Sequence, residues 1–208
     1  MNRDRPSLLA TFGFAFSGLL RALLTERNMK IHWVCGLAVL MVGMALPLPL
    51  GARTALLFAL VLVLALETLN CALEAVVDLA GPDWSVAART AKDAAAGAVL
   101  VVALGAAFLL ADVLAHRWPL VEASGVAVRR TLTFGLPSLA GLAASLALPR
   151  GAGSGLALGV AAVALAPLVL ASQDAVFSLL ACLLLAAAGA ARALEPRLLS
   201  GDPPGPRG

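Results

Sequence analysis

The feature that most restricts this sequence is a set of apolar stretches without any ionisable side chain. Residues 131–149 and 153–173 are two such stretches, and residues 54–66 form a shorter one. A helix needs about 20 mostly apolar residues to cross the hydrocarbon core of a bilayer. The composition agrees, because 61% of the residues are hydrophobic and only 13% are charged. Since helices satisfy their own backbone hydrogen bonds in lipid, the sequence predicts an all-α, multi-pass membrane protein.

Prolines, glycines and charged residues divide the apolar sequence into separate predicted spans. In chain order these spans are 31–46, 53 to about 80, 91–114, 131–149, 153–173 and 174–191. The turn between the last two is short, so five spans with one re-entrant segment are an alternative. Tryptophans near the predicted boundaries are typical of anchors in the membrane interface, and they are Trp33, Trp84 and Trp118.

The segment before the first span has an amphipathic pattern. After Pro6, apolar side chains recur at three- and four-residue spacing up to Leu23, and the opposite face is mostly small or polar. This pattern predicts a helix that lies in the membrane interface. Charged residues at Arg21 and Glu26 interrupt the segment and no small-residue cleavage site follows, so we do not expect a signal peptide.

The distribution of basic residues predicts the orientation. With a cytoplasmic N-terminus and six spans, eleven of the fifteen Lys and Arg residues fall on the cytoplasmic side. The outer side then carries only Arg53, Arg117, Arg129 and Arg130. Cytoplasmic loops are normally enriched in Lys and Arg, so we expect a protein of the inner (cytoplasmic) membrane. No basic stripe interleaved with aromatic residues is present, so nucleic acid is not an expected partner.

One predicted membrane helix carries a polar face. In the segment ETLNCALEAVVDL, residues 67–79, the side chains of Glu67, Asn70, Glu74 and Asp78 fall within about 80° of one another at 100° per residue. At ~1.5 Å per residue from Arg53, Glu67 lies about 21 Å into a ~30 Å hydrocarbon core. Glu67 is therefore expected near the cytoplasmic surface, and Glu74 and Asp78 at or beyond it.

Clustered carboxylates at this depth need a positive partner, because repulsion and desolvation disfavour their charged forms. The predicted topology brings Glu26, Lys92 and Asp93 to the same cytoplasmic interface. Oxygen ligands favour Mg²⁺ shared with substrate phosphates, with Lys92 as a counter-charge and a free carboxylate as general base. This arrangement suits phosphoryl transfer to a lipid alcohol. Structural ion pairs or a proton path would use the same residues, and no GxxxxGK[ST] loop is present.

Three sequence blocks follow the amphipathic helix in a characteristic order. They are ERNMKIH (26–32), ETLNCALEAVVDL (67–79) and AKDAAAGAVL (91–100). Over about residues 8–115 the sequence resembles the prokaryotic diacylglycerol kinase/undecaprenol kinase family. The resemblance implies one surface helix followed by three spans. It also implies an ATP- and Mg²⁺-dependent lipid kinase that works as a homotrimer with its sites between subunits.

The resemblance also implies roles for individual residues. Glu67 corresponds to the catalytic base, and Glu26 and Glu74 correspond to the metal ligands. The positions that hold nucleotide phosphate correspond to Asn70, Lys92 and Asp93. We therefore expect a site that combines carboxylates from two helices with a lysine from a third.

The lipid substrate is less constrained than the reaction. The first and third blocks look more like the undecaprenol-phosphorylating branch of the family. The inferred groove walls beside the acidic face, which include Leu69 and Leu73, offer almost no hydrogen-bond donors for a glycerol ester. We expect undecaprenol as the substrate, with diacylglycerol as the alternative. A non-enzymatic alternative is a proton relay or carrier that uses the same carboxylates.

The resemblance covers only the first half of the chain. We predict a kinase core at 1–117, a connecting loop at 118–130 and accessory transmembrane helices at 131–194. The last segment, 195–208, ends in GDPPGPRG and is expected to be disordered. No second acidic face follows residue 117, so we do not expect a second enzyme.

Overall fold

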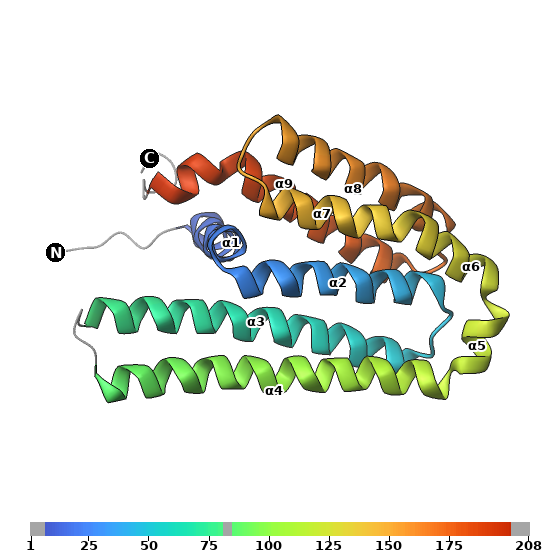
Figure 1. The fold of residues 1–208 in the computed structure, drawn as a ribbon, viewed down its shortest axis with the longest axis horizontal. Helices are drawn as coiled ribbons and strands as arrows, with labels where there is room; N and C mark the ends of the chain where they lie inside the picture. Colours follow the sequence, from blue (N-terminus) through green and yellow to red (C-terminus); the bar gives the residue numbers. More distant parts are fainter. Residues whose placement is uncertain (1–6, 81–84, 201–208) are drawn as a thin grey trace.

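A computed structural model describes residues 7–80 and 85–200, and every element in these ranges is helical (Figure 1). In chain order the elements are α1 (Leu8–Thr25), α2 (Arg27–Ala45), α3 (Leu50–Ala80), α4 (Val86–His116), α5 (Trp118–Ala123), α6 (Gly125–Arg130), η1 (Thr131–Gly135), α7 (Leu136–Ala147), α8 (Ala152–Ala171) and α9 (Ala175–Ser200). Six of these helices are long and apolar enough to cross a membrane. The predicted all-α membrane fold is confirmed.

The six helices that could span a bilayer differ in part from the predicted set. They are α1, α2, α3, α4, α8 and α9. Helix α1 qualifies by length and apolarity, although its pattern predicts a surface helix. Figure 1 shows α1 nearly end-on while the other long helices run across the view. A helix crossing the others in this way is oriented to lie along a membrane surface, so its interfacial placement stays our prediction.

The segment 118–130, predicted as a connecting loop, is helical and forms α5 and α6. Pro119 lies in the first turn of α5, where a missing N–H costs nothing. After α6 the chain continues through one π-helical turn, η1, into α7. Pro137 follows this turn, and its missing N–H and bulky ring explain why the α-helical hydrogen bonds are interrupted there. The predicted span at 131–149 therefore begins with a π turn.

The predicted disordered tail also begins too early. Helix α9 continues through Pro196 to Ser200, so residues 195–200 are helical. Residues 201–208 lie outside the described residues, as does the predicted interfacial anchor Trp84. The helical region after the kinase core is therefore longer at both ends than predicted.

The helices form two groups that meet on α2. Helices α3 and α4 pack against each other as a long hairpin, and α7 packs against α8. Helix α9 packs on both α1 and α2 (Figure 1). This contact buries Leu20 and Leu23 of α1 together with Leu37 and Leu40 of α2. The C-terminal helices thus cover the side of α2 that faces away from the α3–α4 hairpin.

Close packing and one hydrogen bond join α2 to α9. The indole Nε1 of Trp33 donates to the carbonyl oxygen of Leu184 at 2.9 Å, and Trp33 is only 4% exposed. The predicted role of Trp33 as an interfacial anchor is therefore wrong. At Gly43, an added Cβ would lie 2.4 Å from the ring of Phe177. In membranes, small residues and polar contacts of this kind drive helix association.

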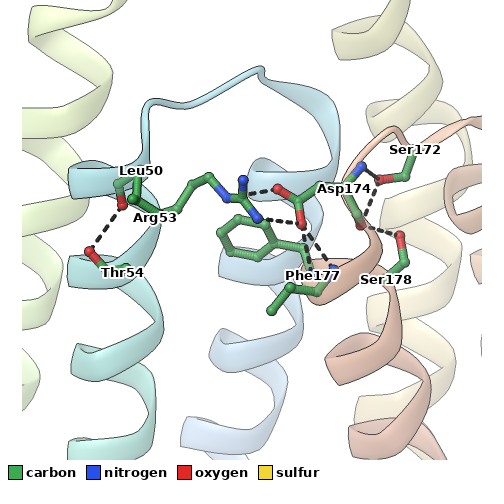
Figure 2. Close-up of polar contacts among 8 residues, drawn as sticks. Leu50, Arg53, Thr54, Ser172, Asp174, Phe177 and Ser178 are labelled. Atoms are coloured by element: carbon green, nitrogen blue, oxygen red, sulfur yellow. Dashed lines mark hydrogen bonds and ion pairs between the residues drawn. The ribbon is translucent and has the colours of Figure 1, made fainter.

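A second polar contact joins the two groups at the opposite end from α1 (Figure 2). Arg53 of α3 reaches Asp174, which precedes α9, through Nε at 2.8 Å and Nη2 at 3.1 Å. The same carboxylate accepts hydrogen bonds from the backbone N–H groups of Val176 and Phe177. Asp174 therefore both caps α9 and ties it to α3.

Candidate functional site

The polar face predicted on α3 is present. Glu67 is 2% exposed and Asn70 is 6% exposed, whereas Glu74 is half-buried and Asp78 is exposed. Helix α3 has 31 residues, or ~46 Å, so it exceeds a ~30 Å hydrocarbon core. The polar face consequently begins inside the packed bundle and continues toward the exposed end of the α3–α4 hairpin.

Two oxygen atoms on this face have unused hydrogen-bonding capacity. Asn70 donates from Nδ2 to Oε1 of Glu74 at 3.0 Å, which orients the amide along the helix. Glu67 Oε2 and Asn70 Oδ1 are buried and have no hydrogen-bond partner among the described residues. Leaving a buried acceptor unpaired costs about 1–3 kcal/mol. Such atoms are therefore expected to bind a ligand that the chain alone does not supply.

Glu26 belongs to the same group of carboxylates. It is the residue between α1 and α2, with an extended backbone that turns the chain from one helix into the next. Thr25 Oγ1 donates to its Oε1 at 3.1 Å. Glu26 and Glu74 are both close enough to Glu67 to repel its charged form. The helix junction thus delivers a carboxylate from another part of the chain to the face of α3.

The two predicted phosphate-binding residues on α4 differ in their positions. Lys92 forms an ion pair with Asp78, so it joins the end of the polar face. Asp93 instead pairs with Arg89 on its own helix, with 3.4 Å between Oδ2 and Nε, and its side chain is 71% exposed. Within one chain, Lys92 therefore lies with the carboxylates of α3, and Asp93 points to solvent.

The donor set suits a hard cation, although no complete site is formed by one chain. Within 7–80 and 85–200, no three His, Cys, Asp or Glu residues are grouped closely enough to hold a metal ion. The carboxylates of Glu26 and Glu74, beside the unpartnered oxygens of Glu67 and Asn70, are oxygen donors, the ligand type that Mg²⁺ prefers. Further ligands would have to come from substrate phosphates, water or another subunit.

An apolar cavity lies between α2, α3 and α4, beside this site. Its volume is about 390 Å³, and its lining includes Ile31, His32, Leu60 and Val63. Val63 is one helical turn before Glu67, so the lining of the cavity on α3 ends one turn from the buried carboxylate. The predicted groove residue Leu69 is instead 63% exposed. The arrangement can hold an apolar chain next to Glu67.

Comparison with known proteins places the chain in a family. The sequence profile of prokaryotic diacylglycerol kinase matches residues 13–114. Undecaprenol kinase of Bacillus subtilis is 36% identical over 94 residues, which are 45% of this chain and 76% of that protein. The chain belongs to the prokaryotic diacylglycerol kinase family. The names of the family and of these relatives indicate a lipid kinase.

Two further relatives carry the other substrate in their names. Diacylglycerol kinase of Synechocystis is 44% identical over 102 residues, which are 49% of this chain and 58% of that protein. Diacylglycerol kinase of Escherichia coli K12 is 30% identical over 45% of this chain and 77% of that protein. The chain thus spans less than two thirds of the Synechocystis protein. No solved structure matches the chain.

The structure brings together most of the residues predicted from the sequence. Glu67, Asn70 and Glu74 share one face of α3, and Glu26 is near enough to repel the charge of Glu67. Lys92 pairs with Asp78 at the end of this face, whereas Asp93 pairs with Arg89. The apolar cavity was not predicted, because no pattern within one helix shows that α2, α3 and α4 leave space between them. The only ionisable residue of its lining that the sequence blocks contain is His32, the last residue of the first block.

Proposed function

We propose that this protein phosphorylates a membrane lipid alcohol with ATP as the phosphoryl donor. The observation that carries the proposal is the buried carboxylate of Glu67, which has an unpartnered oxygen and lies one helical turn beyond Val63 in the lining of an apolar cavity. A lipid chain in this cavity would present its hydroxyl to a group able to accept a proton. The family and the names of its members support the same reaction class.

The proposed mechanism uses Glu67 as general base. Its carboxylate accepts the proton of the lipid hydroxyl while that oxygen bonds to the γ-phosphorus of ATP. The bond from the γ-phosphorus to the β–γ bridging oxygen breaks, so the products are a lipid phosphate and ADP. Lys92 would bind phosphate oxygens through its ammonium, and Asn70 would do so through the amide N–H that does not donate to Glu74. Asp93 completes the predicted nucleotide-binding set.

Glu26 and Glu74 are the proposed ligands of Mg²⁺. Their carboxylates would hold the ion beside Glu67, where it would neutralise charge on the β- and γ-phosphates of ATP. In this arrangement the hydrogen bond from Asn70 to Glu74 keeps one metal ligand in position. Glu67 then keeps its unpartnered oxygen for the substrate hydroxyl.

We propose undecaprenol as the main substrate, with diacylglycerol as the alternative. The lining of the cavity is almost entirely apolar, and His32 is its one ionisable residue besides the thiol of Cys35. Such a lining suits a polyprenyl chain, whereas diacylglycerol carries ester carbonyls that would lack donors. The named relatives divide between both substrates, so their names support either lipid.

We also propose that the site faces the cytoplasm of the inner membrane and is completed in a homotrimer. The exposed position of Asp93 supports a shared site, because Asp93 does not reach the carboxylates of its own chain. Co-reconstituting Glu67→Gln and Asp93→Asn chains tests this proposal. Sites shared between subunits would recover part of the activity in the mixture, whereas sites within one chain would stay inactive.

The reaction itself is tested with purified protein in mixed micelles that contain undecaprenol or diacylglycerol. Labelled phosphate from Mg-ATP should enter the lipid fraction, with a higher kcat/KM for undecaprenol. A clear preference for diacylglycerol would overturn the substrate and leave the reaction intact. If no lipid alcohol is phosphorylated, the kinase proposal fails. A proton relay or carrier would then explain the carboxylates better.

A further inference from the structure

The C-terminal helices contain a basic pocket that plays no part in the proposed reaction. It has a volume of about 710 Å³ and lies where α8 begins and α9 approaches its end. Its lining includes Arg150, Gly151, Ser154, Gly155, Gly189 and Arg192. A Cβ added at Gly151 or Gly155 would meet nothing within 4 Å, so this part of the pocket is open. The pocket therefore combines free space with two guanidinium groups.

The two arginines have different roles in the fold. Arg192 is largely buried and donates to the carbonyl oxygens of Ser145 and Leu148, while its Nη1 lies 3.1 Å from Oε2 of Glu195. Its Nε has no hydrogen-bond partner among the described residues. Arg150 is exposed and forms no ion pair within the described parts of the chain. Since Glu195 balances only one of the two cations, the pocket keeps a positive charge.

An apolar groove continues from this pocket along the same two helices. The groove has a volume of about 520 Å³ and lies between α8 and α9. Leu158 and Gly189 line both the pocket and the groove, so the two spaces are contiguous. From there the groove follows Ala162, Ala166 and Leu170 along α8. From Leu158 to Leu170 this path measures ~18 Å at ~1.5 Å per residue.

The basic pocket and the apolar groove follow each other as the charged headgroup and the acyl chain do in a phospholipid. Figure 1 shows that α8 begins, and α9 ends, at the end of the bundle where α1 lies. Because α1 is the predicted surface helix, the basic pocket at this end would lie at the headgroup level, and the groove would run toward the middle of the membrane. We propose that the α8–α9 cleft binds an anionic phospholipid, with the headgroup phosphate at Arg150 and Arg192 and an acyl chain in the groove.

The basic pocket and the apolar groove together favour a phospholipid over a free phosphate ion or a partner helix. A free phosphate ion would use the arginines but would leave the apolar groove unexplained. A partner transmembrane helix would fill the groove but would not account for two guanidinium groups at its end. A phosphate-bearing lipid with net negative charge satisfies both, because basic residues at the headgroup level attract such lipids.

Native mass spectrometry of the detergent-solubilised full-length protein tests the proposal. Phosphatidylglycerol and phosphatidylcholine are titrated separately, and we expect more retained phosphatidylglycerol per subunit. Arg150→Gln should weaken phosphatidylglycerol binding about fivefold, the effect of removing one cation from the contact. Arg150 is exposed, so this change leaves the packing intact. Equal retention of the two lipids would overturn the proposal.

Two matched variants separate the cleft from general charge effects. Arg197→Gln removes one exposed cation from the same end of α9 without touching the cleft, and it should leave binding unchanged. Ala166→Phe fills the groove from an exposed position and should weaken binding as strongly as Arg150→Gln. Equal loss in Arg150→Gln and Arg197→Gln, or full binding in Ala166→Phe, contradicts the proposed site. Complete displacement by inorganic phosphate contradicts it as well.

Discussion

Glu67 shows at the residue scale how burial and an unused acceptor identify a chemical role. Its side chain is 2% exposed and Oε2 has no partner among the described residues, although Asn70 one turn away donates a hydrogen bond to Glu74 two turns away. Glu67→Gln keeps the shape but removes the base, so we expect kcat to fall about 10²–10⁴-fold. ATP affinity should change little, because a general base acts mainly in the transition state.

Steady-state kinetics and ATP binding measured on the same preparation check this prediction. Glu122→Gln is the matched control, because Glu122 lies on α5 at the other end of the bundle. Its activity should equal that of the unmodified protein. Substantial turnover by Glu67→Gln would remove Glu67 from the role of base.

Also at the residue scale, Glu26 and Glu74 are expected to set how much Mg²⁺ the reaction requires. Each substitution, Glu26→Gln or Glu74→Gln, removes one charged oxygen ligand from the proposed Mg²⁺ site. We expect the Mg²⁺ concentration for half-maximal activity to rise in both variants. Titrating Mg²⁺ at saturating ATP measures this concentration, with Asp112→Asn on α4 as a control for loss of an exposed carboxylate. An unchanged Mg²⁺ requirement in both variants would argue against these ligands.

At the element scale, the pairing of α7 with α8 depends on the absence of a side chain at Gly141. A Cβ at this position would lie 2.6 Å from the carbonyl oxygen of Ala157 and 2.8 Å from the backbone N of Ala161. Ser138 also donates to the carbonyl oxygen of Ala161 at 2.9 Å. Because these neighbours are backbone atoms, Gly141→Ala must push the helices apart and should cost about 1–3 kcal/mol.

The thermal stability of the detergent-solubilised protein measures this effect. Gly141→Ala should lower the Tm, whereas Gly159→Ala on α8 should not, because its Cβ would meet nothing within 4 Å. Alanine also favours the helix over glycine, so Gly159→Ala is expected to hold or raise the Tm. A Tm for Gly141→Ala equal to that of Gly159→Ala would show that the close approach is not required.

At the scale of the whole molecule, the C-terminal helices pack on a core segment that contains every candidate catalytic residue. Deleting residues 120–208 removes the partners of Trp33 and Arg53 and uncovers apolar side chains of α1 and α2. Lipid can cover those apolar side chains, because hydrocarbon tails are as apolar as leucine. We therefore expect a shortened protein that inserts into membranes and keeps activity, with a lower Tm.

Membrane fractionation, lipid phosphorylation and thermal melting of the shortened protein test this expectation. Glu67→Gln in the shortened chain provides the inactive reference. A shortened protein that is inserted and folded yet inactive would show that the C-terminal helices complete the site. An unchanged Tm would show that the contacts of α9 with α1 and α2 add no stability.

The sequence by itself determined those features that depend on local spacing. Apolar length predicted the membrane helices, and the 100° step of an α-helix placed Glu67, Asn70 and Glu74 on one face. The sequence did not predict α5 and α6, because charged residues and a glycine in segment 118–130 are typical of a loop. Pro119 is nevertheless well placed to begin a helix.

Only the tertiary structure decided how the C-terminal helices meet the kinase core. Trp33 bonds to a carbonyl 151 residues away, and Arg53 pairs with Asp174 121 residues away. Arg192 reaches carbonyl oxygens at the end of α7, which closes one side of the basic pocket. Such partners share no periodicity with each other, so their pairing follows from which helix faces pack together rather than from any pattern along the chain.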